Sequence, residues 1–367
     1  MSRTDPLRRN PRRLLLGAVA VVVVAAALAL SAYATTPRTH GVAGDWQAKP
    51  LDGRVVGRVL LSGDHTALDL RTGKSVSLGS AAGGRAYAGD GRLVVAGTGR
   101  VDSVGLDGTG RWTWRPPPGL AAVPLAARRG STLVAACPAD ASAPCDLVGL
   151  DAGGHEAWRT TGSGRVAVPE GQGLPHVYAA ASGGGVVLVD PVDGRQGLVP
   201  GDQSTGVPDG PVVLSAVQDG RCVVAAYDGA DPLWTRVLGA CAAGPGPRVT
   251  SVTVAPGTLV VDGPDGGTGL DPATGREQTG SGRSAAVTGD VVARTAGLAV
   301  TRERHSTPLD PLRWGSPTTV LTVVDTGSGR EVGQVASTGR LDLLLLDGDG
   351  LVVRTDDGVT RYTLPRR

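Results

Sequence analysis

Four cysteines have the most readily specified chemistry in this 367-residue chain. Cys137 follows one apolar run and Cys145 precedes the next, so a hairpin would bring them together, and Cys222 and Cys241 bracket a second predicted hairpin. An even number of cysteines favours disulfides in an oxidising compartment, and the sequence has no C-x₂-C spacing of the kind common in zinc sites. We therefore predict the disulfides Cys137 with Cys145 and Cys222 with Cys241, although four cysteines allow three pairings.

Aspartates form the second candidate group, because they recur at one place in a repeated phrase. The phrase is a short apolar run, an aspartate, two or three turn residues, a glycine and usually a basic residue. Its aspartates are Asp69, Asp107, Asp151, Asp190, Asp228, Asp271 and Asp325. Gathered carboxylates could act as general acids or bases if their pKa were raised. Aspartate also bonds to its own backbone and glycine accepts a positive φ, so turn chemistry explains the phrase without a site.

Motifs for metal, cofactor and nucleophile chemistry do not meet their requirements. Asp347-Gly348-Asp349-Gly350 opens like a calcium loop, but Leu351 and Gly358 occupy two of the ligand positions, so we interpret it as a β-turn. The five histidines show neither H-E-x-x-H nor a paired spacing, and no serine has glycine at both minus two and plus two. We predict no catalytic or metal-ligating residue and no cofactor.

Candidate residues for a partner-binding surface lie in the longest interval between successive repeat aspartates, from Asp271 to Asp325. That interval contains an insertion, roughly residues 305–317, which we expect to form a long loop on one face. Arginine and tryptophan are favoured at binding hot spots. The candidate contacts are Arg302, Arg304, Arg313 and Trp314. A solvated loop without function is the competing interpretation.

The elements that must position all these residues are short strands. The steps between successive repeat aspartates are 38, 44, 39, 38, 43 and 54 residues. Self-similarity near 40 residues, with strand and turn pieces and no helical periodicity, indicates a radial array of four-stranded blades. We predict an all-β fold, a β-propeller of eight four-stranded blades, with seven as the alternative. A lone strand at residues 42–47 is expected to complete the last blade, so that both ends of the domain close the ring.

The N-terminal segment differs from the repeats. Residues 1–13 hold five arginines, and the uncharged apolar stretch 14–34 would rise about 31 Å as a helix, enough to cross a hydrocarbon core. We predict a basic cytoplasmic segment (1–13), one transmembrane helix (14–34), a linker (35–41) and an exported propeller (42–367). A signal peptide cleaved at Ala32-Tyr33-Ala34 is the alternative, and the protein would then be secreted.

The charge balance bears on the partners. The first 34 residues hold five of the 36 basic and one of the 34 acidic residues, so the remainder is slightly acidic. No basic surface for nucleic acid is implied, and we predict no nucleic-acid partner.

The repeated phrase resembles the repeat of quinoprotein-type β-propellers, the PQQ-binding-like family that includes the propeller lipoprotein of the outer-membrane barrel-assembly machinery. Its consensus runs approximately A-x-D-x-x-T-G-x-x-x-W. Matching residues are Ala67, Asp69, Thr72 and Gly73, then Asp151, Gly154 and Trp158, then Asp271, Thr274 and Gly275. Gly110 and Trp114 match after a turn shortened by one residue, whereas Ser77 and Thr279 stand at the tryptophan position.

The resemblance implies structural roles for one set of residues. The tryptophans, Trp114, Trp158 and Trp234, are expected to dock between neighbouring blades. The structural blade residues are Asp69, Gly73, Asp107, Trp114, Asp151, Trp158, Asp190, Gly194, Asp271, Gly275, Asp325 and Gly329. The family's quinone-dependent dehydrogenases use a vicinal cysteine pair, and no two cysteines are adjacent here, so a quinone enzyme is not expected.

The predicted function is a non-catalytic, membrane-anchored, extracytoplasmic scaffold or binding module. Its expected partners are the membrane, through the N-terminal helix, and an envelope protein. Two alternatives stay open: an extracytoplasmic propeller hydrolase or lyase, and a sensor of a small ligand or glycan. A carboxylate cluster with raised pKa would favour the enzyme, and a deep aromatic-lined pocket would favour the sensor.

Overall fold

The computed structural model of the chain describes fourteen stretches. They are residues 37–63, 65–78, 84–140, 143–161, 177–179, 186–199, 203–206, 211–240, 251–255, 258–263, 266–277, 290–294, 297–305 and 317–365. These stretches form strands and turns, and they contain no helix long and apolar enough to span a membrane. The predicted basic segment and transmembrane helix, residues 1–34, lie outside them.

The strands form eight antiparallel sheets, which we number as blades in chain order. Blade 1 contains β2 Gly53–Val56, β3 Val59–Ser62, β4 Thr66–Asp69 and β5 Ser75–Ser77; blade 2 contains β6 Ala86–Gly89, β7 Arg92–Gly97, β8 Arg100–Gly105 and β9 Trp112–Trp114. Blade 3 contains β10 Leu120–Arg128, β11 Ser131–Pro138, β12 Asp146–Leu150 and β13 Glu156–Thr160; blade 4 contains β14 Val177–Ala179, β15 Val186–Val189 and β16 Gln196–Val199.

The remaining blades follow the same pattern. Blade 5 contains β17 Gln203–Gly206, β18 Val212–Gln218, β19 Arg221–Asp228 and β20 Asp231–Ala240; blade 6 contains β21 Ser251–Ala255, β22 Thr258–Gly263 and β23 Gly266–Leu270. Blade 7 contains β24 Asp290–Arg294, β25 Leu298–His305, β26 Thr318–Asp325 and β27 Glu331–Ser337; blade 8 contains β28 Leu341–Leu346, β29 Gly350–Thr355, β30 Gly358–Thr363 and β1 Ala43–Ala48.

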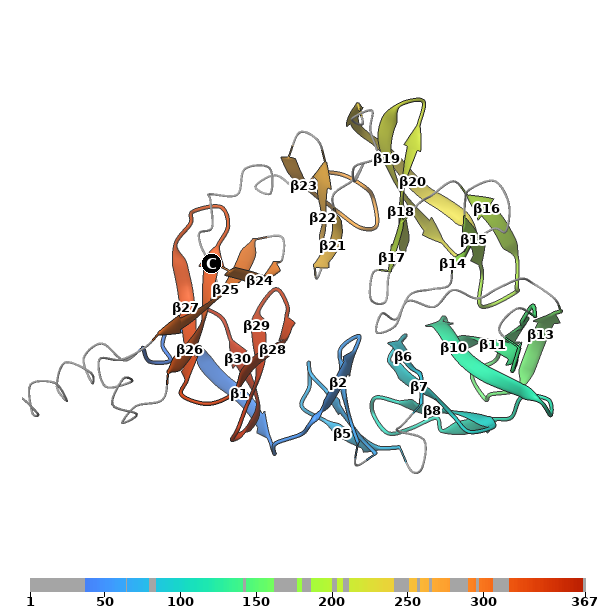
Figure 1. Cartoon of the computed structure of the whole chain (residues 1–367), viewed down its shortest axis with the longest axis horizontal. Coiled ribbons are helices and arrows are strands. Elements are labelled where there is room, and N and C mark those ends of the chain that lie inside the picture. Colours follow the sequence, from blue (N-terminus) through green and yellow to red (C-terminus); the bar gives the residue numbers. More distant parts are fainter. Residues whose placement is uncertain are drawn as a thin grey trace, which may run out of the picture.

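The blades stand side by side around a ring, in chain order (Figure 1). Six sheets have four antiparallel strands, as predicted, and blades 4 and 6 have three each within the described residues; with the radial arrangement, these sheets are consistent with a β-propeller. Successive strands are antiparallel, so the turns between first and second strands and between third and fourth strands lie at the same end of each blade. We call this end the AB face. The opposite end, with the turns between second and third strands, is the BC face.

The first and last strands of the domain share one blade. β1 pairs with β30, with Ala43 opposite Thr363 and Ala48 opposite Val359. Just before β1, the backbone N–H of His40 donates to Gln334 O at 2.9 Å, and that of Gln334 donates to His40 O at 2.8 Å. The N-terminal part of the propeller therefore joins blade 7 first and then completes blade 8, which leaves no unpaired edge at this junction.

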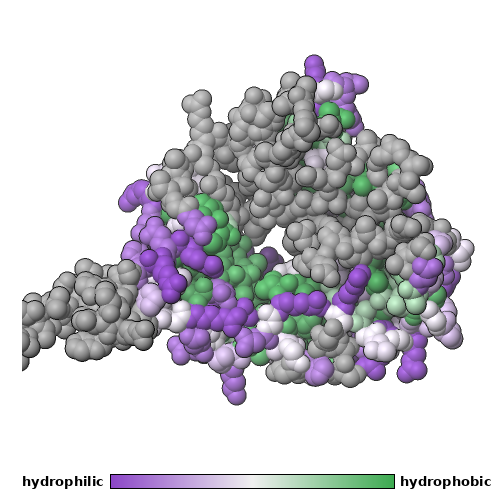
Figure 2. Space-filling view, in the orientation of Figure 1, coloured by the Kyte–Doolittle hydropathy of each residue, from purple (hydrophilic) through white to green (hydrophobic). Residues whose placement is uncertain are grey.

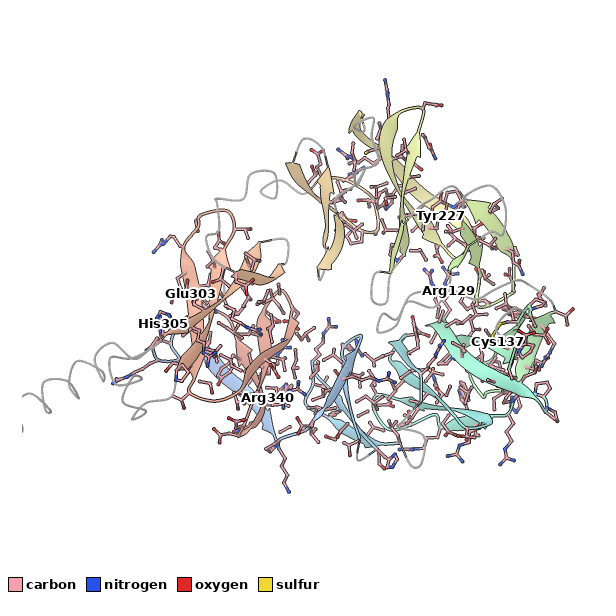
Figure 3. The ribbon with its side chains drawn as sticks, in the orientation of Figure 1. Arg129, Cys137, Tyr227, Glu303, His305 and Arg340 are labelled. Carbon is pink, nitrogen blue, oxygen red and sulfur yellow. A yellow bond between two sulfur atoms is a disulfide. The ribbon has the colours of Figure 1, made fainter. Side chains whose placement is uncertain are left out.

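Apolar side chains fill the space between neighbouring blades. Valine and leucine dominate the middle strands, where branched side chains suit a pleated surface with both faces covered. One cluster joins Leu60 and Leu68 of blade 1 to Val352 and Val359 of blade 8, and all four are fully buried. Figure 2 shows hydrophobic residues towards the middle of the ring and hydrophilic ones around it, and Figure 3 shows side chains extending between the sheets. The core is thus distributed around the ring.

Candidate functional site

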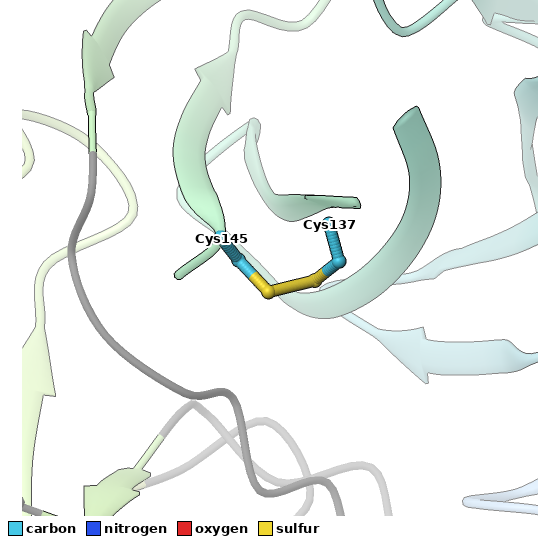
Figure 4. Close-up of a disulfide and its surroundings, with 2 residues drawn as sticks. All are labelled: Cys137 and Cys145. Atoms are coloured by element: carbon cyan, nitrogen blue, oxygen red, sulfur yellow. A yellow bond between two sulfur atoms is a disulfide. The ribbon is translucent and has the colours of Figure 1, made fainter. Parts of the chain in front are cut away.

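The Cys137–Cys145 disulfide closes the hairpin of β11 and β12 on the BC face of blade 3 (Figure 4). The two Cα atoms are 4.2 Å apart. Cys222, at the start of β19, is also disulfide-bonded and fully buried. Its predicted partner, Cys241, lies outside the described residues. A disulfide within one blade fixes a local hairpin.

The repeat aspartates are used by the turns in which they occur. Asp271 shows the pattern: its Oδ1 accepts the backbone N–H of Ala273 at 2.9 Å and that of Thr274 at 2.8 Å, and its own carbonyl accepts Gly275 N at 2.8 Å. The carboxylates that bond to a backbone N–H in this way are Asp69, Asp107, Asp151, Asp190, Asp271 and Asp325. These residues therefore act as turn residues.

Hydrogen bonding keeps three of the turn carboxylates, Asp107, Asp151 and Asp271, acidic. The backbone N–H of Thr109 lowers the pKa of Asp107, that of His155 lowers the pKa of Asp151, and that of Thr274 lowers the pKa of Asp271. A general base or acid at neutral pH would need a shift in the opposite direction. In addition, the described stretches contain no group of three or more histidine, cysteine or acidic residues that could hold a metal ion.

Asp228 departs from the pattern of the other repeat aspartates. It ends β19, and its carboxylate pairs with Arg128, the last residue of β10, and at 2.9 Å with Arg129 of the following turn. Arg129 is labelled in Figure 3. The AB turn of blade 3 is thereby joined to the turn between β19 and β20 of blade 5. This ion pair bridges blades that are not consecutive in the chain.

Tryptophans from one blade lie on the turn glycine of the next blade. A Cβ on Gly73 would lie 2.7 Å from the Trp46 indole, and one on Gly275 would lie 2.5 Å from that of Trp234. Trp112 covers Gly154 and Trp158 covers Gly194, each at 2.7 Å by the same measure. Only glycine fits these positions, because the φ angles are also positive. The glycine of the repeat is thus required by the neighbouring blade as well as by its own turn.

Hydrogen bonds orient two of these indoles. Trp158 Nε1 donates to Pro191 O at 3.1 Å, and Trp234 Nε1 donates to Pro272 O at 2.8 Å. Both carbonyls belong to the residue that follows the repeat aspartate in the next blade. The structural role expected for Trp158 and Trp234 agrees with this geometry, in which the polar edge of each partly buried ring has a partner.

In blade 2 it is Trp112, two residues before the predicted Trp114, that lies on the next turn glycine. Both side chains are buried on one side of β9, because alternate residues of a strand share a side. The turn before β9 is compact, since Gly105 N donates to Thr109 O at 2.9 Å. The consensus spacing therefore predicted the correct strand, β9. The tryptophan that lies on the next blade is Trp112, two positions before the predicted Trp114.

An arginine occupies the place where blade 1 provides no tryptophan. Ser77 stands at the tryptophan position there, and Arg92 lies on the blade 2 turn glycine, Gly110, with Nη1 3.1 Å from where a Cβ would be. Arg92 Nε donates to Ser103 Oγ at 3.1 Å, and Nη2 donates to Gly110 O. Its guanidinium carbon is 5.8 Å from the centre of the Trp112 ring. The direct hydrogen-bond partners of Arg92 are thus neutral, and the charges of Asp90 and Asp107 act on it from farther away.

Beside Arg92, a cleft of about 430 Å³ opens on the AB face between blades 1 and 2. Its lining comes from turns of blades 1, 2 and 3. The charged side chains in that lining are Arg58, Lys74, Arg92, Asp69, Asp90 and Asp107. Three positive and three negative groups meet here, with no aromatic residue in the lining, so the cleft suits a polar or charged group of a ligand.

The candidate contacts predicted from the longest repeat step lie elsewhere. Arg302 and Arg304 belong to strand β25 of blade 7, where they pair with Leu321 and Thr319. They were expected beside a loop, and the structure extends the strand to His305. Arg313 and Trp314 lie outside the described residues. The two described arginines are near the BC face, away from the cleft between blades 1 and 2.

A buried ion network at the closing blade was not foreseen from the sequence. Arg361 of β30 is 6% exposed and forms two bonds to Asp347, which is 4% exposed, at 2.9 and 3.2 Å. Its Nη2 also bonds to Asp349 Oδ1 at 2.8 Å, and its Nε lies 3.4 Å from Asp45 Oδ2. The segment that resembled a calcium loop is thus an AB turn whose carboxylates bind an arginine. A single arginine among the residues of β30 (GVTRYT) was the available signal.

Comparison with known proteins gives no family for the chain. No family model matches the sequence, and no curated protein matches it. Similar solved structures include Sqt1 of Saccharomyces cerevisiae, with 10% identity, a TM-score of 0.38 and coverage of 91% of this chain and 100% of that chain. The β-propeller domain of Cps50 (Swd1) from Myceliophteria thermophila has 14% identity, a TM-score of 0.33 and coverage of 89% and 99%.

Quinoprotein structures are also among the similar folds. The quinohemoprotein alcohol dehydrogenase ADHIIG of Pseudomonas putida has 14% identity, a TM-score of 0.29 and coverage of 86% of this chain and 67% of that chain. All three TM-scores are below 0.5 and all three identities are below 25%, so these likenesses assign no function to this chain.

Proposed function

We propose that this chain is a non-catalytic, protein-binding β-propeller that is exported and held at the membrane by the apolar segment 14–34. The proposal rests on one observation: the carboxylates of the repeat aspartates are already bonded within the protein, most of them to the backbone of their own turns. Six of the seven repeat aspartates bond to their own backbone, and Asp228 pairs with arginines. The residues that recur most often therefore build a rigid ring, and the exposed cleft on the AB face offers a surface for a partner.

The extracytoplasmic location rests on two features of the chain. Five arginines precede the apolar segment, and such charges stay on the cytoplasmic side. The Cys137–Cys145 disulfide supports an oxidising compartment, because disulfides are rare in the cytosol.

The experiment is affinity recovery of the full-length protein from native membranes after crosslinking, followed by mass spectrometry. We expect one envelope protein to be enriched reproducibly and the peptide covering residues 14–34 to be recovered with the bait. Recovery without crosslinker and recovery with an unrelated single-span membrane protein are the controls. A bait that returns alone would count against the binding function, and a bait that begins near Thr35 would count against the anchor.

A further inference from the structure

Among the described residues, two cations of the cleft between blades 1 and 2, Arg92 and Lys74, have no direct ion-pair partner, although the charges of Asp90 and Asp107 act on Arg92 from farther away. Arg92 donates to a serine hydroxyl and a backbone carbonyl, both neutral. In the stretches that the structure describes, no carboxylate lies within 4.0 Å of the Arg92 guanidinium or of the Lys74 ammonium. Arg92 is partly buried whereas Lys74 is exposed, so one charge is fixed in the cleft wall and the other can move.

The carboxylates of the same cleft are already engaged. Asp69 Oδ1 accepts the backbone N–H of Arg71 at 2.9 Å and lies 3.9 Å from Arg58 Nε. Asp90 Oδ2 accepts Gly130 N at 2.8 Å. Each of these carboxylates thus has a donor from the protein itself.

Asp107 completes the set of acidic groups in the cleft. Its Oδ1 accepts both the backbone N–H and the hydroxyl of Thr109, at 2.9 and 2.8 Å. These two bonds lower the pKa of Asp107, and the charge of Lys74 adds a smaller lowering. Lys74 and Asp107 therefore act on each other from the turns of adjacent blades, although no direct ion pair joins them.

Arg92 is well prepared to bind an anionic group. A guanidinium has five N–H donors, and the bonds described above use only two of them. The Trp112 ring and the Ser103 hydroxyl hold the side chain in place, so little further ordering is needed when a ligand binds. A carboxylate matches the fork of an arginine, since two parallel N–H···O bonds can form.

We propose that this cleft binds an acidic side chain of a partner protein, with Arg92 as the fixed donor and Lys74 as the mobile one. The proposal rests on the protein-binding function proposed above and names the chemistry of the partner segment. A site of about 430 Å³ accommodates one or two side chains of such a segment. The carboxylates of the cleft are each bonded to an N–H of the protein itself, so Arg92 and Lys74 are the groups left to bind a glutamate or aspartate of that segment.

The direct test uses the full chain in detergent micelles and a fluorescent ten-residue peptide of alternating glutamate and glycine. The matched peptide has glutamine in place of every glutamate. Fluorescence anisotropy should show tighter binding of the glutamate peptide, weakening as salt rises. We expect R92Q to weaken its binding about tenfold or more, because a charge-assisted bond in a partly buried site is lost. K74Q should weaken binding about two- to fivefold, as for an exposed charge.

Two variants provide matched controls. Asp219-Gly220-Arg221 forms the same kind of hairpin turn as the turn before Arg92, with positive φ at both Asp219 and Gly220, but it lies on the BC face. R221Q should leave peptide binding unchanged. Arg276 occupies the position in the blade 6 turn that Lys74 has in blade 1, and R276Q should likewise have no effect.

Further variants keep the test decisive. R92K retains the charge without the fork and should bind between the wild type and R92Q. If R92Q fails to fold, K74E reverses an exposed charge and should abolish binding of the glutamate peptide. Equal binding of both peptides, or unchanged binding by K74E, would overturn the proposal. If a membrane partner is still recovered with these variants, the binding function stands and the cleft is not its site.

Discussion

Trp158 and Gly194 allow a quantitative test of how neighbouring blades are joined. Gly194 has a φ of 75°, and a Cβ there would lie 2.7 Å from the Trp158 indole. Gly220 has a φ of 73° and open space around a Cβ. Gly220→Ala therefore measures the cost of the backbone conformation alone, about 1–2 kcal/mol. Gly194→Ala adds displacement of a packed ring, about 1–3 kcal/mol for an overpacked site.

The expected free energy of unfolding thus falls by about 2–5 kcal/mol in G194A and by about 1–2 kcal/mol in G220A. Guanidinium denaturation of both variants, followed by tryptophan fluorescence, provides the measurement. The second step repeats G194A in a W158A background. Without the indole, the added methyl group meets open space, so the cost should drop to that of G220A. Equal losses of unfolding free energy in G194A and G220A would refute the docking argument. So would an unchanged extra loss for G194A in the W158A background.

Three further outcomes follow from the same structure. R361M should lower the free energy of unfolding by about 3–5 kcal/mol, because it leaves a buried carboxylate without its cation; denaturation against the exposed R221M measures this. The folded-state pKa of Asp271 is lowered, so its stabilisation is present above the unfolded pKa of about 3.9 and is lost as pH falls through the folded value; the thermal midpoint should decline below about pH 4, and less steeply in D271N. Replacing the Cys137–Cys145 pair by serines should cost about 2–3 kcal/mol in denaturation, because the bond closes a short loop.

The repeat turns were predictable because their chemistry is local. An aspartate followed by a glycine in a short segment specifies both the side-chain bond to the backbone and the positive φ, as at Asp271 and Gly275. A spacing near 40 residues then indicated four-stranded sheets. The pairing of β1 with β30 followed from counting strands, since the last repeat had three of its own.

Contacts between blades were less accessible from the sequence. Trp112 rather than Trp114 lies on the neighbouring glycine because a compact turn changes the position within β9. Arg92 fills a place that Ser77 leaves open, and this substitution involves residues of two blades. Arg361 meets carboxylates from β1 and from the β28–β29 turn. Such contacts join segments whose relative placement is fixed by the whole ring. They therefore cannot be predicted from the composition or the spacing of a single repeat.

Because β1 and β30 lie in the same blade, blade 8 can form only after β30 has been synthesised. β1 is synthesised early, yet its hydrogen-bonding partner β30 emerges at the far end of the sequence. Until then the edge of β1 is exposed. His40 likewise cannot form its backbone hydrogen bonds until Gln334 has been synthesised. A chain that stops before Gly358 would keep an open ring with two free strand edges, which proteases and chaperones recognise. Because its two end strands share a blade, the ring can close only after the whole domain has been synthesised.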